Sequence, residues 1–204
     1  MKLFHSPTSP YVRKVMACAI ARELHERIEC LPTNPHVVPA ELTAANPLSK
    51  VPCLVTADGL SLFDSPVICE YLDSLEGALP LFPRAGGARW LALRQQALAD
   101  GMLDAAVGRR MELAKPHEAA RAAFMARQAA VVVRSLDELE RSVPHRVLDI
   151  GTISVACALG YLDFRFGAEP WRTGRPQLTG WYEAFAQNPC MTQTVPADPP
   201  PAAA

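Results

Sequence analysis

The segment MKLFHSPTSPYVRKV, residues Met1–Val15, combines a strand, a turn and the start of a helix. Leu3 and Phe4 belong to a short apolar run that is suited to a buried strand. Ser6-Pro7-Thr8 predicts a turn, and Ser9-Pro10 places a favoured N-cap residue before a proline at the first helical position. We therefore expect the Ser9 hydroxyl at a helix N-terminus, where free backbone N–H groups and the helix dipole favour an anion.

The helix that follows is predicted to bury a single face. Its apolar residues recur at the i, i+3, i+4, i+7, i+8 spacing of an amphipathic helix: Val12, Val15, Met16, Ala19 and Ile20. Most Ser-Pro helix starts only cap their own helix, so this segment alone does not indicate a function. The rest of the chain decides how it is interpreted.

Short strands and helices alternate through the first third of the chain. After the first helix we expect a strand over Arg27–Leu31 with Ile28 and Cys30 on one face, a helix over Pro39–Ala45, strands over Val51–Thr56 and Leu60–Phe63, and a helix that Ser65 caps. Ala57-Asp58-Gly59 predicts a hairpin between the last two strands. This order predicts a small α/β layer with two parallel-type crossovers and one hairpin.

Beyond residue 77 the pattern becomes helical. Residues 78–87 are rich in proline and glycine and predict a linker. Long helical patterns follow, over Ala88–Leu113, Glu118–Glu140, Asp149–Leu162 and from about Pro176 to Asn188. We therefore predict a first domain over residues 1–77, an all-helical domain over 88–196, and a disordered tail over 197–204.

Composition excludes several classes of protein. The chain has 204 residues and a formal net charge of -1, which gives no reason to expect nucleic acid or an anionic membrane as partner. Its apolar runs are too short to span a bilayer, and no secretory signal pattern begins the chain. Six cysteines without a C-x-x-C pair indicate reduced, mostly buried thiols in a cytoplasmic protein, and the five histidines lack metal-ligand spacing.

Three motifs in order, supported by two later segments, resemble the bacterial, serine-type glutathione S-transferases. The motifs are Ser9-Pro-Tyr-Val-Arg-Lys14, Asn46-Pro-Leu-Ser-Lys-Val-Pro52 and Phe63-Asp-Ser65, and the later segments are Leu79–Pro83 and Ala156–Arg165. The likeness covers nearly the whole chain. It implies an α/β thioredoxin-like domain followed by an all-α helical bundle, in a protein that forms a homodimer.

The resemblance also implies a glutathione site along the edge of the first domain. A cis Val51-Pro52 bond would turn the Val51 N–H and C=O outward, so that the tripeptide pairs with them like an added strand. The Asp64 carboxylate would lie near the γ-glutamyl ammonium, and the Ser65 hydroxyl with its helix N-terminus would bind the γ-glutamyl carboxylate. Lys50 would neutralise the glycyl carboxylate, although an exposed, solvated lysine explains this residue equally well.

Ser9 would then donate its hydroxyl to the glutathione sulfur. A free thiol has a pKa near 8.5, and lowering it by about two units takes about 2.7 kcal/mol of preferential stabilisation of the thiolate. A hydrogen bond to a charged partner supplies about 1.5–3 kcal/mol, and a helix N-terminus about 0.3–1 kcal/mol. No general base is needed. Ser6 and Thr8 are alternatives, and Ser9 is preferred because it precedes the proline that starts the helix.

The second domain is implied to hold the electrophile. Tyr11 would line the cleft, and Met102, Leu103 and Met111 would contact the substrate, although helical spacing favours core packing for most of them. The family commonly begins a helix of this domain with a hydroxyl residue followed three residues later by Asp. Here Asp149 and Thr152 exchange these positions, which predicts a weaker reciprocal bond, and Gly151 costs helix propensity.

The function that this resemblance implies is conjugation of glutathione to a small hydrophobic electrophile, as in detoxification. The alternatives are a non-catalytic protein of the same fold that binds glutathione or other partners, and a glutathione-dependent lyase, isomerase or peroxidase. No metal is expected, and glutathione is the co-substrate.

Overall fold

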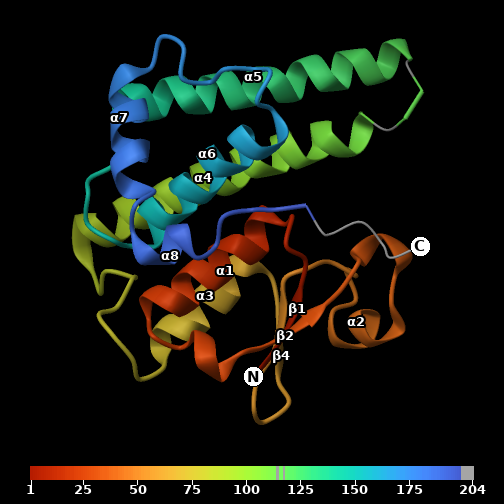
Figure 1. Cartoon of the computed structure of the whole chain (residues 1–204), viewed down its shortest axis with the longest axis vertical. Coiled ribbons are helices and arrows are strands. Elements are labelled where there is room, and N and C mark those ends of the chain that lie inside the picture. The colour runs from red at the N-terminus through yellow and green to blue at the C-terminus, as the bar shows by residue number, and fades with distance from the viewer. Residues whose placement is uncertain (114, 117, 199–204) are drawn as a thin grey trace. The chain divides into compact units, whose positions relative to one another are not determined.

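The computed structural model describes residues 1–113, 115, 116 and 118–198, and it divides the chain into two compact units (Figure 1). The first unit contains Met1–Arg84 and the segment that begins at Pro189. The second unit contains Ala85–Asn188.

The first unit is built on a four-stranded mixed sheet in the order β2-β1-β3-β4. The strands are β1 (Lys2–His5), β2 (Glu29–Pro32), β3 (Cys53–Val55) and β4 (Ser61–Leu62). β1 pairs in parallel with β2 and antiparallel with β3, and β3 pairs antiparallel with β4. A crossover helix joins the parallel pair, and the Asp58-Gly59 turn joins the final hairpin, with Gly59 at φ 88°.

Helices cover both faces of this sheet. α1 (Pro10–Ala21) and α3 (Ser65–Ser74) pack against each other on one face, and α2 (Ala40–Ala45) lies on the other (Figure 1). Side chains of a strand alternate between the two faces, and here both alternating positions are buried: Leu3 lies inside, and Phe4 packs with Leu42 and Cys53. This arrangement is a thioredoxin-like layer, as the sequence predicts.

Several short elements in the first unit were not predicted. They are the 3₁₀ turns η1 (His25–Arg27) and η2 (Pro35–Val37) and the helix α8 (Pro189–Thr192). α8 contacts α1, and Arg13 Nη2 donates a hydrogen bond of 3.3 Å to the Met191 carbonyl. The sequence assigns residues up to 196 to the helical domain, whereas the segment from Pro189 clusters with the first unit. The domain limits 1–77, 78–87, 88–196 and 197–204 stay predictions, and residues 199–204 of the tail lie outside the described residues.

The second strand also differs from the expectation. It begins at Glu29, two residues later than predicted, because η1 occupies His25–Arg27. Ile28 is the C-cap residue of η1 and its backbone is extended, so the alternation of an extended chain still places Ile28 and Cys30 on one face, although Ile28 is buried and Cys30 is exposed.

The second unit is all-helical. Its helices are α4 (Gly86–Glu112), α5 (Ala119–Arg141), α6 (Ile150–Arg165) and α7 (Pro176–Phe185). α4 packs on both α5 and α6, and every residue of α6 from Ile150 to Leu162 is buried. A helix that is apolar all round belongs in the interior of a unit, and α6 is the core of this one.

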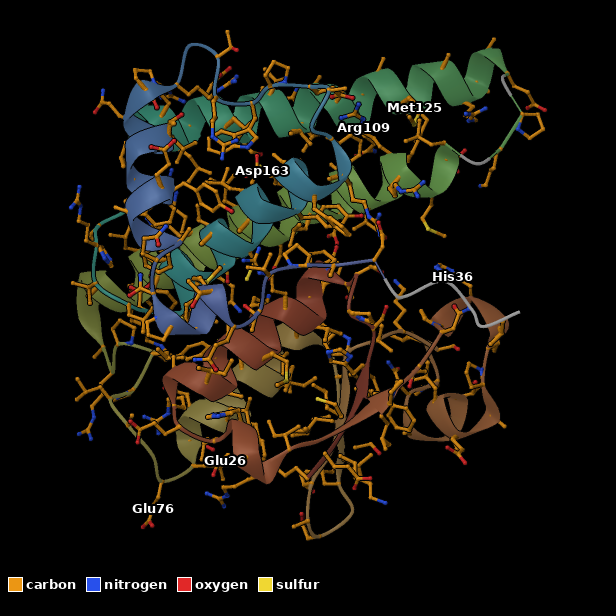
Figure 2. All side chains as sticks on the ribbon, viewed as in Figure 1. Glu26, His36, Glu76, Arg109, Met125 and Asp163 are labelled. Atoms are coloured by element: carbon orange, nitrogen blue, oxygen red, sulfur yellow. The ribbon has the colours of Figure 1, made fainter. Side chains whose placement is uncertain are left out.

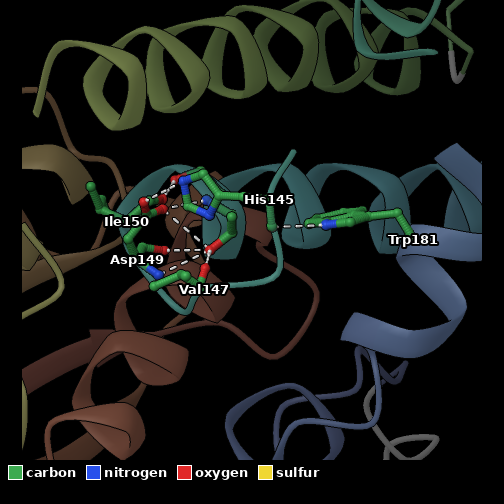
Figure 3. Close-up of polar contacts among 7 residues, drawn as sticks. His145, Val147, Asp149, Ile150 and Trp181 are labelled. Atoms are coloured by element: carbon green, nitrogen blue, oxygen red, sulfur yellow. Dashed lines mark hydrogen bonds and ion pairs between the residues drawn. The ribbon is translucent and has the colours of Figure 1, made fainter. Parts of the chain in front are cut away.

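A complete capping box begins α6 (Figure 3). Thr152 N donates to Asp149 Oδ1 at 2.8 Å, and Asp149 N donates to Thr152 Oγ1 at 3.0 Å. His145 Nε2 lies 3.2 Å from Asp149 Oδ2, and Trp181 Nε1 donates to the His145 carbonyl at 3.0 Å. The exchanged acid and hydroxyl therefore form both bonds of the box, and the exchange does not prevent the reciprocal bond.

Candidate glutathione site

The turn between β1 and α1 presents the Ser9 hydroxyl at the start of the helix. Ser9 N donates to the Ser6 carbonyl at 3.1 Å and closes the turn. Ser9 is the N-cap of α1, and its Oγ accepts a hydrogen bond of 3.3 Å from Val12 N. A hydroxyl that accepts one hydrogen bond still carries its own proton, so Ser9 keeps a donor to offer a ligand.

The two alternative hydroxyls of this turn lie next to each other. Ser6 Oγ and Thr8 Oγ1 are 3.4 Å apart, within hydrogen-bonding distance of one another. Only one of the two can donate to the other, so the accepting hydroxyl keeps its own proton, as Ser9 does. Ser9 differs from both because it is the N-cap of α1.

Positive charge gathers in the first turns of α1. No acidic residue lies in its first turn, while Arg13 and Lys14 are both buried. Arg13 reaches the Met191 carbonyl through Nη2, and its Nε and Nη1 have no hydrogen-bond partner among the residues described. Burial lowers the pKa of His5, so this imidazole is neutral at pH 7 and does not add to the charge. The sequence motif contained both basic residues, but periodicity alone did not indicate that they are buried.

The loop before β3 is held by Asn46, the first residue of the Asn46–Pro52 motif. The Asn46 side chain is buried, with Nδ2 donating to the Lys50 carbonyl at 2.9 Å and Oδ1 accepting from Leu48 N at 3.0 Å. The Val51-Pro52 peptide bond that follows is cis, as predicted. Val51 is half-buried, Pro52 is buried, and Lys50 is exposed. Asn46 therefore fixes the backbone from which Lys50 and Val51 are presented.

The start of α3 corrects one expectation. Asp64, not Ser65, is the N-cap residue, because the extended backbone of Asp64 moves the helix boundary one position earlier. Asp64 makes no capping bond, and in the described part of the chain its carboxylate has no hydrogen-bond or ion-pair partner. Ser65 is the first helical residue and is only 1% exposed. The prediction that Ser65 caps the helix is wrong. The Asp64 side chain is exposed and accessible to a ligand, whereas the Ser65 side chain is buried.

The four predicted electrophile contacts are not brought together within either unit. Tyr11 is half-buried on α1, in the first unit, and the other three lie on α4. Met102 and Leu103 are fully buried, whereas Met111 is 46% exposed. Nine residues, or two and a half helical turns, separate Met102 from Met111, so they face opposite sides of α4. These contacts stay predictions.

Cysteine chemistry is disfavoured at this site. All six cysteines are free thiols, and five are buried. Burial raises the pKa of Cys53 to about 11, so its nucleophilic thiolate form is scarce at neutral pH. No cysteine occupies the β1–α1 turn, where the serine lies.

Within residues 1–113, 115, 116 and 118–198, no group of three or more His, Cys, Asp or Glu side chains is placed to hold a metal ion. No helix in the same set of residues has the length and apolar character needed to cross a membrane.

Comparison with known proteins assigns the class. The glutathione S-transferase N-terminal domain matches residues 8–75, and the glutathione S-transferase C-terminal domain matches residues 122–184. The GST-like protein YibF of Escherichia coli K12 is 36% identical over 202 residues, which cover 96% of this chain and 98% of YibF. The chain belongs to the glutathione S-transferase family, as its motifs suggested.

Two crystal structures of relatives extend the match to three dimensions. A glutathione transferase family member from Pseudomonas fluorescens Pf-5, with bound glutathione, is 41% identical with a TM-score of 0.90, covering 97% of this chain and 99% of that one. A glutathione S-transferase from Methylobacillus flagellatus KT, with glutathione bound, is 32% identical with a TM-score of 0.87, covering 96% and 99%. The thioredoxin-like layer followed by a helical unit is thus the fold of this family.

Proposed function

We propose that this protein is a glutathione transferase, which binds glutathione on the first unit, ionises its thiol at Ser9 and transfers the sulfur to a small hydrophobic electrophile. The geometry of Ser9 carries this proposal. Its Oγ already accepts from Val12 N at 3.3 Å and keeps its own proton to donate, at a helix N-terminus that has no acidic residue in its first turn. A thiolate bound there receives a hydrogen bond and the favourable end of the helix dipole.

The magnitudes are sufficient for ionisation without a base. Stabilising the thiolate by about 2.7 kcal/mol shifts its pKa by about two units, from about 8.5 to the neutral range. The serine hydrogen bond contributes about 1.5–3 kcal/mol and the helix N-terminus about 0.3–1 kcal/mol. The buried basic side chains of Arg13 and Lys14 on the same helix add to the positive potential.

The rest of the tripeptide is assigned to the two neighbouring loops. Among the residues described, the Val51 backbone has no hydrogen-bond partner, so it can pair with the cysteinyl backbone of glutathione like an added strand. Pro52 follows it, and Lys50 would neutralise the glycyl carboxylate. At α3, the uncommitted Asp64 carboxylate and Ser65 hydroxyl would hold the γ-glutamyl ammonium and carboxylate.

Relatives support conjugation as the reaction. A crystal structure of a Pseudomonas fluorescens Pf-5 family member, 40% identical with a TM-score of 0.85, contains S-(propanoic acid)-glutathione. In that molecule the glutathione sulfur carries a carbon substituent, as a conjugation product does. By analogy, this protein would act in detoxification as a cytoplasmic homodimer that conjugates glutathione to a small hydrophobic electrophile.

The test combines binding with catalysis. Wild-type protein is applied to glutathione-agarose and then assayed with an aryl halide whose halogen thiolates displace. Ser9→Ala is compared with Ser74→Ala, whose exposed hydroxyl only bonds the Tyr71 carbonyl at the end of α3. We expect Ser9→Ala to remain bound to the resin while kcat/KM falls by about 10- to 100-fold, and Ser74→Ala to match wild type.

Two results contradict the proposal in different ways. Failure of the wild-type protein to bind the resin contradicts the glutathione site itself. Binding without conjugation supports the alternatives, a non-catalytic glutathione-binding protein or a glutathione-dependent lyase, isomerase or peroxidase, which a substrate screen separates.

A further inference from the structure

The second unit contains a cavity of about 260 Å³ that the proposed function does not use. Residues of α5 and the end of α6, with the segment that follows α6, form its apolar wall: Val132, Leu136, Leu162, Phe166 and Trp171. Val133, which is 48% exposed, lies at its rim and leaves it open to solvent. An apolar cavity of about 150 Å³ already holds a benzene molecule, so this one has room for a ligand of one or two fused rings.

One charged group on the cavity wall is nearly removed from water. The Arg109 side chain is only 9% exposed and stacks over Phe166, with Cζ 4.6 Å from the ring centroid. Its Nε is buried and has no hydrogen-bond partner in the described part of the chain. Figure 2 shows Arg109 between α4 and α5, beside the segment that follows α6. A buried guanidinium that keeps an unused donor is costly unless an acceptor reaches it.

The carboxylate that pairs with Arg109 accepts a single hydrogen bond from it. Arg109 Nη2 donates to Glu169 Oε1 at 2.6 Å, but the Glu169 side chain is 55% exposed and lies outside any helix. The other arginine of the wall, Arg175, already donates to Asp137 Oδ1 through Nη2 and Nε at 2.6 and 3.1 Å. Asp137 is equally exposed, but it lies in α5 and accepts two hydrogen bonds from Arg175, so the single hydrogen bond between Arg109 and Glu169 costs less to replace.

From these observations we propose that the cavity binds a small aromatic carboxylate, with its rings against Phe166 and Trp171 and its carboxylate on Arg109 in place of Glu169. A carboxylate accepts two parallel hydrogen bonds from a guanidinium, which would occupy the unused Nε as well as Nη2. Aromatic rings of a ligand suit this wall because aromatic pairs gain free energy beyond that expected from their buried area. All of these residues belong to the second unit, so the inference goes beyond the proposed transferase function and does not depend on it.

Calorimetric titration with naphthalene-1-carboxylate, in the absence of glutathione, tests the site. Naphthalene-1-carboxamide serves as the uncharged probe of the same shape. Arg109→Met removes the charge, and Arg110→Met is the matched control, because Arg110 is exposed and does not line the cavity. We expect the carboxylate to bind at least about tenfold more tightly than the carboxamide, and Arg109→Met to remove that difference while Arg110→Met preserves it.

If Arg109→Met does not fold, the variant Glu169→Gln provides an independent test of the same site. Because Glu169 is exposed, its replacement leaves the core unchanged, and removing the competing carboxylate is expected to strengthen binding of the naphthoate severalfold. Val133→Trp, which fills the mouth of the cavity, should abolish binding of both probes. Equal affinity for the carboxylate and the carboxamide, or weaker naphthoate binding in Glu169→Gln, would overturn the proposal.

Discussion

Ser9 and Ser65 each precede a proline at the start of a helix, yet they present their hydroxyls differently. Ser9 is the N-cap, and its Oγ accepts from Val12 N, so its proton and one lone pair remain for a ligand. Ser65 is the first residue within α3, and the helix boundary lies at Asp64. A hydroxyl that keeps its proton at an N-cap suits an anionic sulfur, whereas the helix N-terminus at Ser65 suits a carboxylate.

Asn46 gives a prediction at the same scale. Its amide bonds the Lys50 carbonyl and Leu48 N, so Asn46→Ala should loosen the loop that presents Val51. We expect the affinity for glutathione, measured by calorimetry, to fall by about 5- to 20-fold, since about one to two hydrogen-bond equivalents are lost. Asn34→Ala is the control, because Asn34 only bonds His36 N in an exposed turn. Unchanged affinity in Asn46→Ala would show that the loop does not need this amide.

The parts of the site that the sequence predicted are those that depend on local preferences of single residue types. Ser9 at a helix start and a cis bond before Pro52 follow from local rules on serine and proline, and both are present. The role of Asn46 was missed because its partners are set by the loop's backbone and not by spacing. The burial of Arg13 was missed because its partner carbonyl, Met191, lies 178 residues away.

At the scale of elements, Gly151 shows a requirement of α6 that helix propensity does not describe. A Cβ at this position would lie 2.7 Å from the Ala92 carbonyl oxygen and 2.8 Å from Gln95 Oε1. A residue without a Cβ is thus required where α6 crosses α4. The atoms that require it belong to residues some sixty positions earlier in the chain. Its propensity cost is offset by close helix packing and by the complete capping box of Asp149 and Thr152.

Two glycine-to-alanine variants separate the effect of close helix packing from the effect of helix propensity. Gly151→Ala should lower the free energy of unfolding by about 1–3 kcal/mol, because the new methyl group overpacks the α4–α6 contact. Gly180→Ala, in α7, should raise it by about 0.4–1 kcal/mol, since nothing lies within 4 Å of its Cβ position. Urea unfolding of both variants provides the measurement. A stabilised Gly151→Ala would mean that the two helices do not approach closely.

At the scale of the whole molecule, the cysteines are distributed over the whole chain, and their exposure shows where its side chains are buried. Five of the six cysteines are buried, and the exposed one, Cys30, lies on β2 at the edge of the sheet. The sequence predicted mostly buried, reduced thiols, and this holds. It did not predict which thiol faces solvent, because the edge position of β2 depends on how the strands pair and not on the local pattern.

Thiol titration with a chromogenic disulfide tests this distribution. We expect one cysteine to react in the native protein and all six after unfolding. Desolvation raises the pKa of Cys30, so its thiolate is scarcer at neutral pH and its reaction rate should continue to rise above about pH 9. Cys30→Ser should remove the native reaction, and rapid labelling of several cysteines in that variant would contradict the described packing.

The architecture followed from the sequence more completely than the site did. Alternating strands and helices, then long helical patterns, are local signals, and they predicted the layer and the bundle. The helix α8 was not predicted, because its four residues, Pro189–Thr192, are too few to show a helical period. Its packing on α1 is a long-range contact.

The most direct test of the account is the pKa of the glutathione thiol when it is bound, followed through the ultraviolet absorbance of the thiolate as pH is raised. In the wild-type protein the bound thiol should titrate about two units below its usual pKa of about 8.5, because the Ser9 proton and the α1 N-terminus stabilise the anion. In Ser9→Ala it should return most of the way toward 8.5. An identical titration in both proteins would show that Ser9 does not ionise the sulfur.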